Sequence, residues 1–164
     1  MSIRTTFFAF TVFALTGCPT VVDDTDDTDD TDTPVTIDSD LVGTWVSEGA
    51  DVAPLLAAND VVRVDATFEM DGSYVVTSTD SASSTVDFAG TFTVDESTTP
   101  ATIVLTQTSP YNATADGIWQ IDAGVLSYEV VQAGLGFTAP TPTSGFGSTS
   151  GPGLSPDDNL QIFR

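Results

Sequence analysis

A two-residue alternation of apolar and polar side chains is the feature that most constrains the fold of this chain. Apolar Val64, Ala66 and Phe68 alternate with polar Asp65 and Thr67. Because successive side chains of a strand point to opposite faces, the pattern predicts strands with one face in a core and the other in water. The same period recurs along the chain and predicts about eight strands. We expect them over residues 41–47, 62–70, 74–79, 86–94, 102–106, 117–121, 126–130 and 159–163.

The turn between the second and third expected strands contains an Asp-Gly pair at positions 71 and 72, which is typical of a hairpin. A two-residue loop would set Phe68 opposite Val75, whereas a three-residue loop over 70–72 sets it opposite Tyr74. Only the longer loop gathers the apolar side chains of both strands on one face. Since a slip of one residue would turn every side chain over, we predict the three-residue loop.

Short antiparallel strands joined by turns predict an all-β barrel of about eight strands, because closure removes exposed sheet edges. The one helical candidate is 53–59, where Pro54 suits a first turn, and the Gly- and Pro-rich stretch 133–156 is expected to be a long loop. Gly90 marks either a pocket or a bulge. Six large side chains have the inward parity of their strands, and they either fill the barrel or line a ligand cavity. These are Phe68, Tyr74, Phe88, Phe92, Leu126 and Tyr128.

The amino terminus has the proportions of a bacterial lipoprotein signal. A basic start at Arg4 precedes an apolar run over 7–15, which is too short to cross a bilayer. The run ends in Leu-Thr-Gly-Cys, which resembles the lipobox, so residues 1–17 are predicted to be the signal peptide and Cys18 the lipidated residue. The alternative is an ordinary secretory leader with a chance cysteine. By resemblance to lipoproteins of two-membrane bacteria, Pro19 after the cysteine implies attachment to the outer membrane through several acyl chains.

Residues 18–37 are predicted to be the lipidated cysteine and a disordered acidic tether. The Asp-Thr run over 23–32 has no apolar side chain to bury, and its like charges extend it. A calcium site is the alternative, since oxygen-rich loops suit hard cations. The run lacks the glycine turn and the ligand register of such a loop, so a spacer is favoured. The folded domain then comprises residues 38–164.

The composition excludes several classes of activity. The formal net charge is −21, with three basic residues, no histidine and one cysteine. Such a chain has no cationic patch for nucleic acid, and it lacks the side chains of Ser-His-Asp catalysis, Schiff bases and zinc sites. We therefore expect no enzyme, no metal and no cofactor. Four glutamates could still support carboxylate chemistry, but all fall at positions expected to be solvated: Glu48, Glu69, Glu96 and Glu129.

An ordered series of segments resembles the lipocalins and, more closely, a family of uncharacterised bacterial lipocalin-like domains. The opening Gly43-Thr-Trp45 matches a G-x-W motif, and the segments 68–74, 90–95, 99–106, 117–122 and 160–164 follow in order. The resemblance implies a lipocalin-like barrel in which Trp45 packs under an arginine from the barrel end, here Arg164. The chain departs from the family at Ala139, where an arginine usually precedes the proline.

These observations together predict a non-catalytic, lipid-anchored envelope protein, with the membrane as a partner through the anchor. Its barrel is expected to hold a small apolar ligand, and the chain is expected to be a monomer. The alternative is a structural or protein-interaction module with a solid barrel that contacts a partner through the 133–156 loop. The two differ in the barrel interior, because a carrier needs a concave apolar pocket and a packed barrel has none.

Overall fold

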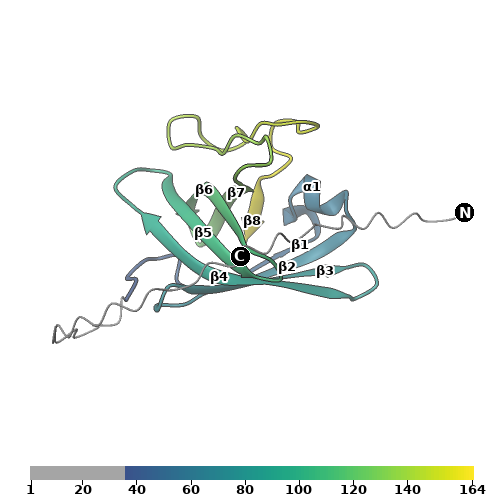
Figure 1. The fold of residues 1–164 in the computed structure, drawn as a ribbon, viewed down its shortest axis with the longest axis horizontal. Coiled ribbons are helices and arrows are strands. Elements are labelled where there is room, and N and C mark those ends of the chain that lie inside the picture. Colours follow the sequence, from purple (N-terminus) through teal and green to yellow (C-terminus); the bar gives the residue numbers. More distant parts are fainter. Residues whose placement is uncertain (1–35) are drawn as a thin grey trace, which may run out of the picture. The chain divides into compact units, whose positions relative to one another are not determined.

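A computed structural model describes residues 36–164 of the chain. The predicted signal peptide 1–17, the lipidated Cys18 and nearly all of the 18–37 tether lie outside the described residues. The described part is an all-β barrel of eight antiparallel strands, as predicted (Figure 1). The strands are β1 (Gly43–Glu48), β2 (Val61–Phe68), β3 (Ser73–Asp80), β4 (Thr85–Asp95), β5 (Ala101–Ser109), β6 (Ala113–Asp122), β7 (Val125–Gln132) and β8 (Gln161–Phe163).

The strands follow one another around the barrel in chain order. The first and last strands then meet through one reciprocal pair of backbone hydrogen bonds. The N–H of Val46 on β1 donates to the carbonyl of Arg164 at 3.0 Å, and the N–H of Arg164 donates back at 2.8 Å. Pairing between β1 and the chain after β8 nearly closes the barrel, and it covers backbone groups that an open edge would expose.

The β2–β3 hairpin has the predicted three-residue register, with Phe68 opposite Tyr74. Gly72 has a φ of 82°, a left-handed conformation that favours glycine. The carboxylate of Asp71 accepts a hydrogen bond from the N–H of Ser73 at 2.8 Å. Hydrogen bonding from Ser73 lowers the pKa of Asp71. Local turn chemistry and apolar parity therefore specify the same register.

The two ends of the barrel differ. Short connections over 69–72, 96–100 and 123–124 form the hairpin end. The opposite end, which we call the loop end, carries the connections 81–84 and 110–112 and the two longer ones. One of these, between β1 and β2, contains a 3-10 turn (Gly49–Asp51) and the short helix α1 (Pro54–Ala57), and the other is the 133–160 connection between β7 and β8 (Figure 1).

The core occupies the barrel interior, where aromatic rings pack edge to face. The ring of Phe68 lies 5.1 Å from that of Phe92 between centroids, and the ring of Tyr128 lies 5.9 Å from that of Phe163. Such pairs contribute about 0.5–1.5 kcal/mol beyond area burial. Leu41, at 0% exposure, closes the core from the segment before β1.

Three apolar residues with inward sequence parity are exposed instead. Val62 falls where the β2–β3 pairing shifts by one residue, and it is 45% exposed. Met70 is 55% exposed because it belongs to the hairpin turn, and Val86 is 48% exposed near the start of β4. The predicted helix 53–59 and the last predicted strand 159–163 are also shorter than expected. Irregular pairing and strand ends explain these departures.

No helix among residues 36–164 has the length and apolar character needed to cross a bilayer.

Candidate ligand site inside the barrel

The barrel has two adjacent chambers at the loop end, and both are open to solvent. Chamber A, of about 180 Å³, lies beside α1, and chamber B, of about 200 Å³, lies between β3, β4, β5 and β7. Val76, Tyr128 and Val130 line both chambers, so the two are separated by little more than these side chains. Chamber A is also lined by Ala53, Leu56, Val64, Ala66, Phe68, Asn159, Gln161 and Phe163, and chamber B by Tyr74, Phe88, Leu105 and Gln107.

The position of the chambers follows from side-chain size along the strands. The aromatic cluster around Phe68 and Phe92 fills the middle of the barrel. Toward the loop end, β2 and β3 present short side chains to the interior, namely Val64, Ala66, Val76 and Ser78. These short side chains cannot reach across the barrel, and the space between them stays open.

The six residues predicted to fill or line the interior divide into two groups. Tyr128 lines both chambers, Phe68 lines chamber A, and Tyr74 and Phe88 line chamber B. Phe92 and Leu126 line neither chamber and are buried core residues, at 2% and 0% exposure.

Gly90 is a site of close backbone approach rather than an opening into a pocket. The β4–β5 pairing shifts by one residue between Ala89 and Gly90. A Cβ atom at Gly90 would lie 2.0 Å from the carbonyl oxygen of Thr106, which no side chain tolerates. The sequence left a pocket and a β-bulge open as interpretations of Gly90, and the structure has the bulge.

Sequence reasoning missed the polar residues of chamber A, above all Gln161. Gln161 is 5% exposed and lies opposite Tyr128 in the β7–β8 pairing. Its Oε1 accepts a hydrogen bond from the N–H of Ala53 at 2.8 Å. The sequence signal that could have identified Gln161 is its two-residue spacing from inward-facing Phe163, because residues two apart on a strand share a face.

Two residues that line chamber A each have a polar atom that is buried without a hydrogen-bond partner among residues 36–164. These atoms are the hydroxyl oxygen of Tyr128 and the Nε2 atom of Gln161. Although part of the Tyr128 side chain stays accessible, its hydroxyl does not. Burial, with a smaller contribution from nearby Tyr74, raises the pKa of Tyr128 far above its usual range. The hydroxyl therefore stays protonated and can donate a hydrogen bond.

Trp45 and Arg164 do not form the barrel-end contact that the lipocalin resemblance implied. Trp45 pairs with inward-facing Ala66, and its indole N–H donates to the carbonyl of Leu41 at 2.9 Å. Arg164 follows inward-facing Phe163 and so has the outward parity. Its guanidinium binds the carboxylate of Asp51, with Nε 2.8 Å from Oδ2. The two side chains thus lie on opposite faces of the sheet.

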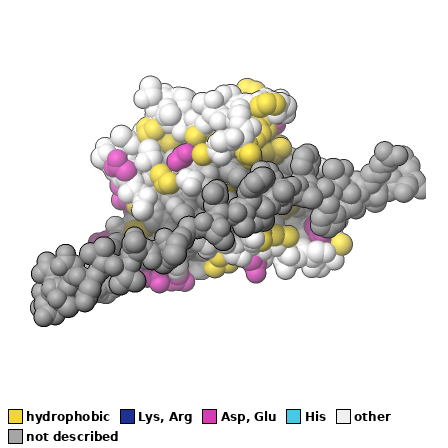
Figure 2. Space-filling model, in the orientation of Figure 1, with side chains coloured by type: hydrophobic (Ala, Val, Ile, Leu, Met, Phe, Trp, Pro, Cys, Tyr) yellow, Lys and Arg dark blue, Asp and Glu magenta, His cyan; other side chains and the backbone are white. Residues whose placement is uncertain are grey.

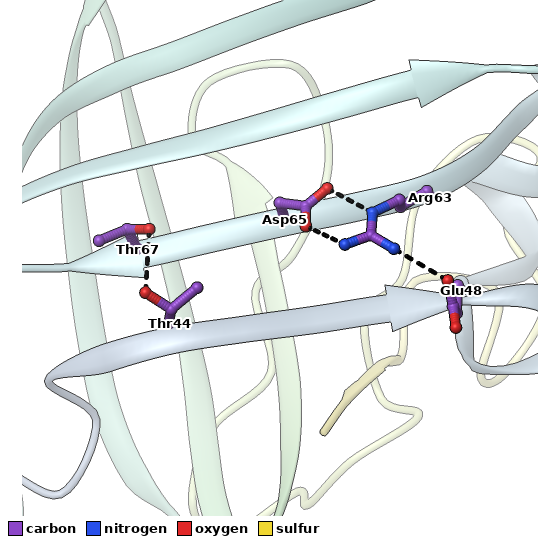
Figure 3. A network of polar contacts seen from close by, with 5 residues as sticks. All are labelled: Thr44, Glu48, Arg63, Asp65 and Thr67. Carbon is purple, nitrogen blue, oxygen red and sulfur yellow. Dashed lines mark hydrogen bonds and ion pairs between the residues drawn. The ribbon is translucent and has the colours of Figure 1, made fainter. Parts of the chain in front are cut away.

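The second basic residue of the described chain is also engaged on the outer face. Arg63 on β2 donates to the carboxylate of Asp65 at 2.6 and 2.7 Å and to Glu48 on β1 at 3.0 Å (Figure 3). The hydrogen bond to Asp65 is the main reason that the pKa of Arg63 is raised. Arg63 and Arg164 are the two basic residues among residues 36–164, and each is paired with a carboxylate outside the barrel.

Glu129 was predicted to lie on a solvated face, and this prediction is wrong. The residue is 1% exposed on β7, between inward-facing Tyr128 and Val130, so its carboxylate lies on the outer face of the sheet. There it accepts hydrogen bonds from the N–H of Gly147 at 2.5 Å and the N–H of Thr149 at 2.8 Å, and from the Thr149 hydroxyl. The 133–156 loop folds over this strand and buries the carboxylate. The other three glutamates are exposed, as predicted.

The acidic side chains of the described chain do not assemble into a metal site. No group of three or more acidic, histidine or cysteine residues within 36–164 is arranged to hold an ion. On the face that Figure 2 shows, the visible acidic side chains lie apart from one another rather than in one patch.

Comparison with known proteins found no matching family model, no matching curated protein and no matching solved structure.

Proposed function

We propose that this chain is a non-catalytic envelope lipoprotein whose barrel holds a small apolar ligand. The observation that carries the proposal is the pair of adjacent open chambers at the loop end, of about 180 and 200 Å³. Their walls are mainly aliphatic and aromatic, with a few polar groups, as in small-molecule sites generally.

The chamber volumes limit the ligand. Chamber A, at about 180 Å³, has the volume of about six liquid waters at roughly 30 Å³ each. Sites for drug-sized molecules run from about 300 to 1,000 Å³. The ligand is thus either a small molecule within one chamber or a slender one that passes Tyr128 and occupies both.

The cellular part of the proposal rests on the sequence. The lipobox ending at Cys18 supports lipidation, Pro19 supports the outer membrane, and the acidic run supports a spacer between membrane and barrel. A Cys18→Ser chain is expected to leave the membrane fraction or to remain unprocessed. A mature Cys18→Ser protein in the membrane fraction would contradict the anchor.

Neither nucleic acid nor a second copy of this chain is well supported as a partner. The net charge of −21 opposes nucleic acid. The reciprocal hydrogen bonds between Val46 and Arg164 occupy the seam where an added strand would pair, which supports a monomer.

The ligand proposal is tested by calorimetric titration of the unlipidated Cys18→Ser chain with propylbenzene. Saturable binding is expected. Val76→Phe enlarges a side chain that lines both chambers and should weaken binding at least tenfold. The matched control is Val75→Phe, because Val75 is the next residue of β3 and points outward with 43% exposure. Equal loss in both variants, or no binding to the parent chain, contradicts the proposal.

A second candidate function uses the 133–156 loop as a contact surface for another protein. The hydrogen bonds from Gly147 and Thr149 to Glu129 favour it, because a loop held in one conformation loses less entropy on binding. The loop also has its own pairing between Thr138 and Ser150. Under this alternative, removing the Glu129 carboxylate should weaken partner binding while Val76→Phe leaves it unchanged.

A further inference from the structure

We propose that the two chambers at the loop end select an uncharged ligand and reject an anion of the same size and shape. The inference rests on the proposed ligand-binding function, which leaves open whether an apolar ligand also carries a charged group. It adds the property by which this protein distinguishes a neutral small molecule from a carboxylate.

The walls of both chambers consist of uncharged residues. No wall residue, all of them within 36–164, is an aspartate, glutamate, lysine or arginine. The polar wall residues are three amides and two phenols, namely Gln107, Asn159, Gln161, Tyr74 and Tyr128. A charged group that leaves water for such a wall loses hydration that no ion pair there replaces. The walls therefore disfavour a charged ligand of either sign.

The two titratable side chains of these walls stay neutral. Burial is the main cause that raises the pKa of both Tyr74 and Tyr128 above the ordinary value of 10.0. The chain also contains no histidine, the side chain that ordinarily changes its charge between pH 5 and 8. The walls are therefore uncharged throughout the neutral pH range.

The basic residues of the described chain are engaged outside the barrel. Arg63 is paired with Asp65 at 2.6 Å, and Arg164 is paired with Asp51 at 2.8 Å. Both arginines have the outward parity of their strands. A carboxylate in either chamber would thus have no cation from residues 36–164 beside it.

Carboxylates at the loop end add repulsion for an anion. The connections at this end contain Asp60, Asp157 and Asp158, and Asp158 directly precedes Asn159, a wall residue of chamber A. Neighbouring Cα atoms lie about 3.8 Å apart, which is less than the Debye length of about 8 Å in physiological salt. Salt therefore screens this repulsion only in part, and the repulsion makes an anion a worse ligand than a cation.

Three planar probes of nearly equal shape test the proposal at pH 7. Nitrobenzene is neutral, benzoate is an anion, and benzamidine is a cation. All three are compact, whereas a fatty acid could leave its carboxylate in the water outside while its tail enters a chamber. Each probe is titrated by calorimetry into the unlipidated Cys18→Ser chain.

Nitrobenzene is expected to bind most tightly. Benzamidine should bind at least about threefold more weakly and benzoate at least about thirtyfold more weakly, because both ions lose hydration and the anion is also repelled.

A cation introduced into the wall should remove the rejection of benzoate. Gln107 is half-buried on the wall of chamber B, so Gln107→Lys should tighten benzoate binding at least about tenfold. The matched control is Thr106→Lys, which adds the same charge at the preceding residue of β5, where the side chain is exposed on the outer face. It should change benzoate binding by less than about twofold. Nitrobenzene binding reports whether the chambers are intact in each variant.

Two results would overturn the inference. One is an ion that binds to the parent chain as tightly as nitrobenzene does. The other is a Gln107→Lys chain that binds nitrobenzene but gains no more affinity for benzoate than Thr106→Lys. In both cases nitrobenzene binding to the parent chain leaves the carrier function standing. If nitrobenzene does not bind to the parent chain, the carrier function itself fails, and the inference fails with it.

Discussion

The carboxylate of Glu129 on β7 accepts hydrogen bonds from both the backbone N–H and the hydroxyl of Thr149 in the 133–156 loop. Thr149 is itself 6% exposed, so the contact is buried on both sides. Charge-assisted hydrogen bonds of this kind are stronger than neutral ones. Through this contact a loop without strands or helices of its own is held against the outer wall of the barrel.

Removing this carboxylate should loosen the loop and destabilise the fold. Glu129→Ala leaves the N–H of half-buried Gly147 and the two donors of buried Thr149 unpaired, at a cost of about 2–3 kcal/mol. Urea unfolding measures the loss, and amide exchange at these two residues should accelerate. Glu48→Ala serves as the control, because Glu48 is exposed and its loss should leave loop exchange unchanged. If the amides of Gly147 and Thr149 stay equally protected from exchange in Glu129→Ala, the hydrogen bonds to Glu129 do not hold the loop in place.

Tyr128→Phe is expected to make the free protein more stable. The Tyr128 hydroxyl is buried without a partner among the described residues, so its removal relieves a desolvation penalty of about 1 kcal/mol. Thermal unfolding measures the gain, with Tyr111→Phe as the matched exposed substitution. A clear loss of stability in Tyr128→Phe would show that the hydroxyl is satisfied in solution.

The same hydroxyl should make the protein sensitive to alkali. Burial raises the pKa of folded Tyr128 above the ordinary value of 10.0. At pH values above 10 the unfolded chain therefore releases a proton that the folded chain keeps. This contribution to stability is constant below about pH 10, and it falls by up to about 1.4 kcal/mol per pH unit above that. Urea unfolding between pH 8 and 11 should show this decline, and Tyr128→Phe should reduce it. Identical pH profiles for the parent chain and Tyr128→Phe would show that Tyr128 does not cause the decline.

Gly90→Ala should be strongly destabilising although it adds a single methyl group. The new Cβ would meet the backbone of Thr106 and Gln107, which cannot move aside as a side chain can. We expect a loss of about 2 kcal/mol or more in urea unfolding. Thr91→Ala, at the exposed neighbouring position, should cost much less. Equal effects would show that the β4–β5 bulge tolerates a side chain.

Sequence alone predicted the features that depend on local pattern. The period of two identified the eight strands, and it predicted the inward positions of Phe68, Tyr74 and Leu126. The hairpin register followed from the same parity together with Asp-Gly turn chemistry, and the structure has that register. These predictions succeed because neighbours within one strand or one turn decide them.

The features that sequence could not predict depend on long-range contacts. Glu129 has the outward parity of its strand, and only the return of the 133–156 loop buries it. Arg164 binds Asp51, more than a hundred positions earlier in the chain. Gln161 becomes part of the site because β8 pairs with Tyr128. Alternation within a strand contains no information about which segment later covers each face.

The central claim is that the loop end of the barrel is hollow and accessible to a ligand. The most direct test is a propylbenzene titration of the unlipidated Cys18→Ser chain, followed by methyl NMR. The methyl signals of Val76 and Val130, which line both chambers, should shift in a saturable manner, while those of outward-facing Val75 stay fixed. Signals of Val76 and Val130 that do not move, or that move no more than those of Val75, would contradict the account.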